Sequence, residues 1–428
     1  MMRLFDRQSL GKYADWFAVG IAIALPWSTT LTVVFVVLWL ATLVGSWNIA
    51  ERCRERWMLA GRLPVALWAL AVVGMLWAAV PLPERFASLN AFHKLLAIPI
   101  FAIQFRDSHR GIWVLIGFLI SCTVLLVVSW GLVLLPDLPW RGHQKIEGGG
   151  MMIGIPVKDY ISQSTMFTLC ILGLAEGALF AWHKASRGIA LAFVLLAIVF
   201  FANILYAAIS RTALVALPIL LVLFTCMRLG WKSAAGTMIA FMVFLAAAWP
   251  TSPHLRERIT NFFDEVRNYQ PTAVSTPAGE RLEYWRKSII IIANAPVFGH
   301  GTGSIHEQFR QLAVGQTGMA ALASANPHNQ IFATAIQLGL IGAGVLLAMW
   351  IAHLLLFFTP GLPAGIGLAV VVQNIVSSQF NSSLFDSTLG WVYVLGVGVL
   401  GGMTLRSSSP MGVHEKRRGG VPCSPTRP

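Results

Sequence analysis

Residues Ala325–Gly342 read ANPHNQIFATAIQLGLIG, and this stretch separates a long polar segment from an apolar helix. The pair Asn326-Pro327 is a turn signal, because a residue before proline is pushed out of helical geometry. We therefore expect the polar segment to end here and a helix to open at His328 and Asn329. The stretch places a titratable side chain at the mouth of that helix.

Two glycines, Gly339 and Gly342, follow further along the same predicted helix. Residues three apart share one helical face, and small side chains there let backbones approach closely inside a bilayer. We therefore expect this pair to serve helix packing. The predicted helix is long, apolar and tightly packed.

The composition of the whole chain is that of a membrane protein. Its mean hydropathy is +0.70 and only 11% of its 428 residues are charged, which excludes a set of soluble domains. Apolar runs recur that are long enough to cross about 30 Å of hydrocarbon. We expect an all-α polytopic membrane protein with twelve membrane helices, in the segments Asp15–Trp47 (a hairpin of two), Leu63–Val80, Phe92–Phe105, Ile112–Leu135, Ile161–Trp182, Gly188–Leu205, Thr212–Met227, Ser233–Trp249, a helix beginning at His328, Leu362–Ser378 and Leu389–Leu405.

These helices form one transmembrane domain over residues 1–405. It includes a long, partly helical loop at 250–327, between the ninth and tenth helices, where the hydrophobic pattern stops. Residues 406–428 form a polar tail that we expect to be cytoplasmic and disordered. The basic N-terminal segment leads into an apolar hairpin without a small-residue cleavage site, so we expect it to be retained.

The distribution of positive charge predicts the orientation in the membrane. Segments on the side of the N-terminus hold 18 Lys and Arg residues, the short loops on the other side hold 6, and the long loop holds 7. Long loops are exempt from the positive-inside rule, so the short ones decide, and they place both termini in the cytoplasm. The net charge of +13 is thus a topology signal and does not indicate nucleic acid as a partner.

Neither a disulfide framework nor a metal site is indicated. The five cysteines show no CxxC pairing, and three of them lie inside apolar runs. No DxD, HExxH or cluster of carboxylates occurs on the extracytoplasmic face. We expect no metal and no cofactor.

Arg211 stands at the extracytoplasmic end of a helix that is otherwise nearly free of charge. A charge at the lip of a membrane is expensive unless it is paired, so it is a candidate functional residue. Its guanidinium suits bidentate capture of a phosphate. The alternative is an arginine that extends to lipid phosphates.

A second group of charges lies on a predicted amphipathic helix in the long loop. Arg281 flanks its apolar face, which makes it the better candidate for a ligand contact, with Arg286 as a further candidate. Glu283 and Lys287 are spaced as an i,i+4 ion pair. The alternative is an interfacial helix whose charges touch only headgroups. Its apolar face follows helical spacing through Leu282, Trp285, Ile289 and Ile292.

The turn Phe298–Gly303, with sequence FGHGTG, is of a type that lets backbone amides approach a phosphate. His328 has a side chain whose ordinary pKa suits a general base near neutral pH. At a helix start it can also be a simple hydrogen-bonding residue. Asp386 fits an N-terminal cap of the last helix, and it lies on the same face of the membrane.

Together these features resemble the bacterial O-antigen ligases, the WaaL family, which shares its core with O-antigen polymerases and protein O-oligosaccharyltransferases. The similarity rests on twelve helices, the long loop after the ninth, and three local motifs. The most specific motif is His328-Asn329 followed after nine residues by Gly339–Gly342. The others are Ser210-Arg211 and the spacing of Arg281 and Trp285.

The resemblance implies glycosyl transfer at the periplasmic face of the bacterial inner membrane. The donor would be an undecaprenyl-diphosphate-linked O-antigen, and the acceptor a sugar hydroxyl of lipid A–core oligosaccharide. His328 would take the acceptor proton. Arg211, Arg281 and Arg286 would hold the donor diphosphate, with Asn329 and Asp386 in support. Such a transfer needs no metal and would invert the anomeric configuration.

Two alternatives remain at this point. A polymerase or protein O-oligosaccharyltransferase of the same superfamily would use the same donor with a different acceptor. A transporter of lipid-linked glycans would belong to another class and would be expected to show mid-membrane charges, broken helices and repeats between its halves. The sequence shows none of these three signs, and it does not indicate an oligomeric state.

Overall fold

The computed structural model describes residues 7–46, 59–135, 137, 144–145, 151–152, 154–271 and 273–407. The basic loop at 52–56 and much of the glycine-rich loop at 136–160 lie outside the described residues. The predicted disordered tail lies outside them from residue 408 onward.

The described chain is almost entirely helical, which confirms the predicted fold class. One small antiparallel pairing joins β1 (Gln144–Lys145) to β2 (Met151–Met152). The helices are α1 (Arg7–Ala24), α2 (Thr29–Ser46), α4 (Leu59–Gly74), α5 (Leu82–His93), η2 (Lys94–Leu96), α6 (Ala97–Asp107), α7 (Gly111–Leu134), α8 (Tyr160–His183), α9 (Arg187–Tyr206), α10 (Arg211–Leu229), α11 (Trp231–Thr251), α12 (Pro253–Arg267), α13 (Pro277–Asn294), α14 (Ile305–Ala313), η3 (Gly318–Ala321), α15 (Gln330–Phe357), α16 (Leu362–Ser377) and α17 (Ser387–Ser407).

Each predicted membrane segment contains a helix in the structure, although the third, predicted at Leu63–Val80, begins at Leu59 and ends at Gly74. Eight helical segments of the described chain are long and apolar enough to span a bilayer. Three shorter helices, α2, α4 and α16, are also apolar, and α1 packs against α2 and α7 in the same bundle. The fourth span differs most from its prediction, because it begins at Leu82 instead of Phe92 and bends through η2 on its way to Asp107.

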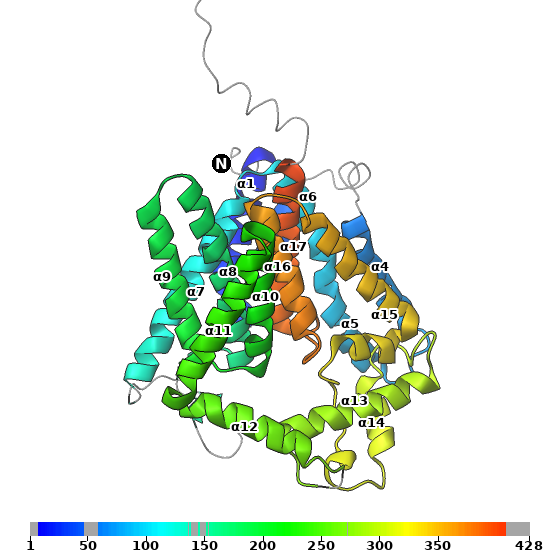
Figure 1. Ribbon diagram of the computed structural model, residues 1–428. Coiled ribbons are helices and arrows are strands. Elements are labelled where there is room, and N and C mark those ends of the chain that lie inside the picture. The colour runs from blue at the N-terminus through cyan, green and yellow to red at the C-terminus, as the bar shows by residue number, and fades with distance from the viewer. Residues whose placement is uncertain are drawn as a thin grey trace, which may run out of the picture.

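The start of α1 and the end of α17 lie at the same end of the bundle, and the helices of the long loop, α12 to α14, lie across the opposite end (Figure 1). This arrangement fits the predicted placement of both termini on one side.

Glycines bring α17 close to α6 in the centre of the bundle. A Cβ atom added at Gly402 would lie 2.6 Å from the carbonyl oxygen of Ala102, and one added at Gly398 would lie 2.5 Å from the Cβ of Phe101. Phe101 in turn stacks on Trp39 with ring centroids 3.9 Å apart. Such close approach of backbones is the usual way in which membrane helices gain packing contacts.

The long loop folds into helices that pack on the membrane domain. The sequence predicted α13 but neither α12 nor α14. The buried face of α13 also differs from the predicted apolar face, because Ile289 is 60% exposed whereas Tyr284 and Ile291 are buried. Tyr284 and Ile291 form a cluster with Phe309 of α14 and Ile336 of α15. The helix is therefore anchored to protein and does not merely lie on lipid.

Helix α15 is broken at Gly339, where φ is 65° and ψ is −166°. The sequence indicated a continuous helix here, so this is a correction. The chain at Pro296–Gly301 inserts into the break, with the carbonyl oxygen of Val297 only 2.1 Å from where a Cβ on Gly339 would stand. Only glycine suits both the positive φ and this approach.

The inserted segment satisfies the helical groups that the break sets free. In an unbroken helix Leu340 and Ile341 would donate to Ile336 and Gln337. Instead all four groups bond to the loop: Leu340 N to Pro296 O (2.7 Å), Ile341 N to Val297 O (3.4 Å), His300 N to Ile336 O (2.8 Å) and Gly301 N to Gln337 O (2.9 Å). The long loop is thereby fixed to the helix that begins at the candidate site.

Candidate active site

The segment that precedes α15 has a conformation set by asparagine side chains. Asn329 caps the helix, since its Oδ1 accepts from the backbone N–H groups of Ile331 (2.9 Å) and Phe332 (3.1 Å). The helix therefore begins at Gln330, two residues later than predicted. His328 has a φ of 52°, and its N–H donates to Asn326 Oδ1 at 2.9 Å. A positive φ is rare for a residue with a Cβ, and it persists only where surrounding contacts fix the backbone.

The imidazole of His328 lies against Tyr284 of α13, with ring centroids 5.9 Å apart and planes at 19°. Its Nδ1 is buried without a hydrogen-bond partner in the described residues. Burial, and to a smaller extent the positive charge of Arg281, lower the pKa of His328 to about 4, while the side chain of Asn381 acts in the opposite sense. The ring is therefore neutral at pH 7 and has a nitrogen available to accept a proton.

The loop between α16 and α17 supports His328, and this role of the loop was not predicted from the sequence. Asn326 Nδ2 donates to Asn381 Oδ1 (3.0 Å), and Ser382 Oγ donates to Asn326 Oδ1 (2.7 Å). Gln330 N also donates to the carbonyl of Ser378 (2.8 Å). The polar run QFNSSLFDS between two apolar helices is the sequence signal that could have indicated it.

Arg211 is the first residue of α10. Its Nη2 lies 3.6 Å from Glu265 Oε1, and its guanidinium lies 5.0 Å from the ring centroid of Phe262, so both partners come from α12. Its Nε and Nη1 are buried and have no hydrogen-bond partner in the described residues. One side of the guanidinium is held, and two of its nitrogens remain available for a ligand.

Arg281 lies on α13, near Arg211 and His328. Its Nε is buried and has no partner in the described part of the chain. Burial lowers its pKa, as does the positive charge of Arg211, while Tyr160 and Glu265 act in the opposite sense. Because Arg281 also acts on the pKa of His328, the three residues form one electrostatic group from α10, α13 and the mouth of α15.

Unpaired donors are concentrated in this group. The Nε1 of Trp285 is likewise buried without a partner, and its ring meets that of Phe332 edge to face. A buried donor left unpaired costs about 1–3 kcal/mol. Several such N–H groups beside two guanidinium groups are suited to an anionic, oxygen-rich ligand.

Arg286 is placed differently from the two other arginines. It forms a bidentate pair with Glu283 at 2.6 and 2.9 Å, and the hydroxyl of Tyr269 donates to the same carboxylate at 2.7 Å. The ion pair predicted between Glu283 and Lys287 is not formed, since Lys287 donates to the carbonyls of Ala320 and Leu322. Arg286 thus already has a partner.

The turn Phe298–Gly303 does not offer its amides to a phosphate. Besides the bonds to α15, Gly299 N donates to Ala295 O (3.1 Å), Thr302 N to Gly74 O (3.1 Å) and Gly303 N to Gln337 Oε1 (2.9 Å). These donors are occupied, so the suggestion of a phosphate cradle is wrong. The turn joins the long loop to α4 and α15.

The remaining residues predicted for the site make contacts within the fold. Asp386 accepts from the N–H groups of Thr388 (2.8 Å) and Leu389 (2.7 Å), which is the geometry of a helix cap. Gly339 permits the approach of the long loop and not of another membrane helix. A Cβ on Gly342 would meet Leu338 of its own helix at 2.3 Å. Among the described residues, no three His, Cys, Asp or Glu side chains gather as metal ligands would.

Comparison with known proteins gives two matches. The family Wzy_C, described as O-antigen ligase, matches residues 196–347, a stretch that contains Arg211, Arg281 and His328. An uncharacterized protein of Haemophilus influenzae is 28% identical over 158 residues, which cover 35% of this chain and 38% of that protein. The family match supports membership of the O-antigen ligase-like superfamily.

Proposed function

We propose that this chain, as a member of the O-antigen ligase-like superfamily, transfers O-antigen polysaccharide from undecaprenyl diphosphate to a sugar hydroxyl of lipid A–core. The reaction would take place at the periplasmic face of a bacterial inner membrane. The observation that carries the proposal is the group of unpaired N–H donors on Arg211, Arg281 and Trp285 beside the neutral imidazole of His328.

The two arginines would bind the donor diphosphate. They carry positive charge that Glu265 offsets only in part, since one carboxylate faces Arg211 at 3.6 Å and also accepts from the N–H of Ala278. A diphosphate would supply oxygens for the free guanidinium nitrogens. It would also gain negative charge as the glycosidic bond breaks, and fixed donors at that position would stabilise the transition state.

His328 would accept the proton of the acceptor hydroxyl. The oxygen of that hydroxyl attacks the anomeric carbon, the bond from this carbon to the diphosphate oxygen breaks, and its electron pair leaves on the diphosphate. The available acceptor is the unpartnered Nδ1. One displacement of this kind inverts the anomeric configuration.

Donor binding would prepare the histidine for this role. In the free protein the pKa of His328 is about 4, partly because Arg281 is near. A bound diphosphate would cancel that positive charge and raise the pKa towards its ordinary value, which strengthens the base. The protein would thereby have a competent base when the donor is in place.

A strain that lacks the chromosomal copy of the gene tests this function. Membranes with the unaltered protein should carry polymer on lipid A–core. His328→Ala should lose that polymer while full-length polymer accumulates on the lipid carrier, because general base catalysis contributes about 10²–10⁴-fold. His306→Ala is the matched control, since His306 is exposed on α14.

The same strain separates the ligase from its alternatives. Loss of polymer length in the deletion strain would identify a polymerase, and attachment of glycan to protein would identify a protein O-oligosaccharyltransferase. Survival of attachment in His328→Ala would contradict the role of this histidine.

A further inference from the structure

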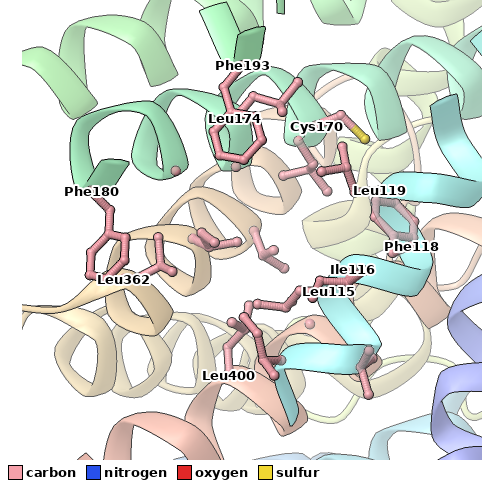
Figure 2. Close-up of a pocket in the computed structure, with 18 of the residues that line it drawn as sticks. Leu115, Ile116, Phe118, Leu119, Cys170, Leu174, Phe180, Phe193, Leu362 and Leu400 are labelled. Atoms are coloured by element: carbon pink, nitrogen blue, oxygen red, sulfur yellow. The ribbon is translucent and has the colours of Figure 1, made fainter. Parts of the chain in front are cut away.

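A large apolar cavity lies between α7, α8, α9, α16 and α17 (Figure 2). Its volume is about 390 Å³, which is within the range of about 300–1,000 Å³ that is usual for ligand sites. Leucine, isoleucine and phenylalanine side chains converge on it from several helices, among them Leu115, Phe118, Leu174, Phe180, Leu362 and Leu400.

This cavity is separate from the candidate active site. Its lining comes from the first turns of α7, α9 and α16 and from the later turns of α8. These ends lie on the side of the bundle where α1 starts and α17 ends, whereas α12 to α14 and the mouth of α15 lie on the opposite side (Figure 1). By the charge distribution, the side of the cavity is the cytoplasmic one.

Part of the cavity wall is formed by side chains that are also exposed on the outer surface of the bundle. Phe180 and Ile189 both line the cavity and are 56% and 54% exposed on the outer surface of the helices. A lipid chain can therefore enter without a path through the protein. Apart from Lys184 and Ser186 the lining is apolar, which favours a hydrocarbon chain inside the cavity.

Two exposed cations lie where α8 ends and α9 begins, at the edge of the cavity that is here called the rim: Lys184 is one of the lining residues, and Arg187 directly follows the lining residue Ser186. Lys184 lines the cavity, and its amine lies 5.9 Å from the ring centroid of Phe180. The guanidinium of Arg187 lies 5.6 Å from the ring centroid of Trp182. Within the described part of the chain neither cation has a carboxylate partner. The apolar cavity and its rim thus match the two parts of an anionic lipid.

We propose that this cavity holds an acyl chain of an anionic phospholipid from the cytoplasmic leaflet, with the lipid phosphate at Lys184 and Arg187. The polyprenyl donor is a poorer fit, because its diphosphate would lie at the opposite end of the bundle, near Arg211. The site goes beyond the proposed transfer reaction and does not depend on it.

Filling the cavity tests the chain-binding part. Gly173 lines the cavity, and a Cβ there would meet nothing within 4 Å, so Gly173→Phe should fit and occupy the space. Gly131→Phe on α7 is the matched control, because a Cβ there also meets nothing within 4 Å and Gly131 does not line the cavity. Native mass spectrometry of protein released from phosphatidylglycerol vesicles should show one bound lipid, lost in Gly173→Phe and kept in Gly131→Phe.

Neutralising the rim tests the headgroup part and needs no change in the core. Lys184→Gln with Arg187→Gln should weaken phosphatidylglycerol retention at least about tenfold and remove its preference over phosphatidylcholine. Lys232→Gln should have no effect, although Lys232 is also exposed and lies 6.0 Å from an indole ring. Equal retention in Gly173→Phe and Gly131→Phe, no preference for anionic lipid, or retention of polyprenyl phosphate instead would each overturn the proposal.

Discussion

The guanidinium of Arg281 on α13 and the imidazole of His328, in the segment that precedes α15, come from different parts of the fold, yet the charge of the first lowers the pKa of the second. In the free protein the imidazole is therefore neutral at pH 7 beside a charged guanidinium. An anion bound beside both groups would offset the charge of Arg281 and raise the pKa of His328. This relationship leads to the first prediction.

Arg281→Gln should raise the pKa of His328 above its value of about 4. The sign follows because removal of a nearby cation makes the imidazolium less unfavourable, and the expected rise is about one pH unit. The pH midpoint for modification of His328 by diethyl pyrocarbonate, which attacks the neutral ring, measures this pKa. Arg286→Gln should leave the midpoint unchanged because Glu283 already neutralises Arg286. An equal shift in both variants would contradict the arrangement.

Asn381→Ala should slow glycan transfer by about 10²-fold, because loss of the contacts with Asn326 would misplace His328. It should also lower the pKa of His328, since Asn381 favours the protonated ring. Donor binding should remain, because the arginines are untouched. The checks are a transfer assay, the same pH titration and a donor-binding assay. Asn294→Ala, an exposed change on α13, is the control. Unchanged transfer in Asn381→Ala would show that the loop does not position the base.

Gly339→Ala should destabilise the protein by more than about 2 kcal/mol. The added Cβ would stand 2.1 Å from the carbonyl oxygen of Val297, and the backbone has a positive φ. The thermal unfolding midpoint in detergent should fall. Gly344→Ala on the same helix should leave it nearly unchanged, because a Cβ there meets nothing within 4 Å. Similar midpoints for the two variants would mean that the break in α15 is not held by the inserted loop.

Asp386→Asn should retain the helix cap and transfer activity, whereas Asp386→Ala should destabilise the protein by about 1 kcal/mol. The reason is that the side chain bonds to the N–H groups of Thr388 and Leu389, which an amide oxygen can also accept. Thermal unfolding and transfer assays of both variants distinguish the roles. Loss of activity in a stable Asp386→Asn would instead assign its charge to the reaction.

Much of the fold could be predicted from the sequence because every helix that crosses a bilayer must be long and apolar. Long apolar runs located the membrane helices, and charge placed Arg211 and His328 on one face. Boundaries shifted where a side chain decided them, as Asn329 did for α15. The packing of the long loop could not be predicted, since the break at Gly339 depends on Val297, more than forty residues earlier.

The candidate site was predicted only in part, because some of its residues have local sequence patterns and others depend on contacts that are distant in the sequence. Arg281 and His328 have distinctive local patterns, and the structure brings them together. Arg286 is also an arginine on α13, but it donates to Glu283 and so already has a partner. The roles of Asn326 and Asn381 in positioning His328 were not predicted, because they depend on one hydrogen bond across 55 residues of sequence, which no local pattern reveals.

In the proposed reaction the arginines bind the donor diphosphate and His328 acts in the chemical step. The most direct measurement is single-turnover transfer by purified protein in liposomes, with donor binding measured on the same samples. His328→Gln should bind the lipid-linked donor normally but transfer at least about 10²-fold more slowly. Arg211→Gln combined with Arg281→Gln should lose donor binding itself. Full transfer by His328→Gln, or unchanged donor binding by the double arginine variant, would contradict these roles.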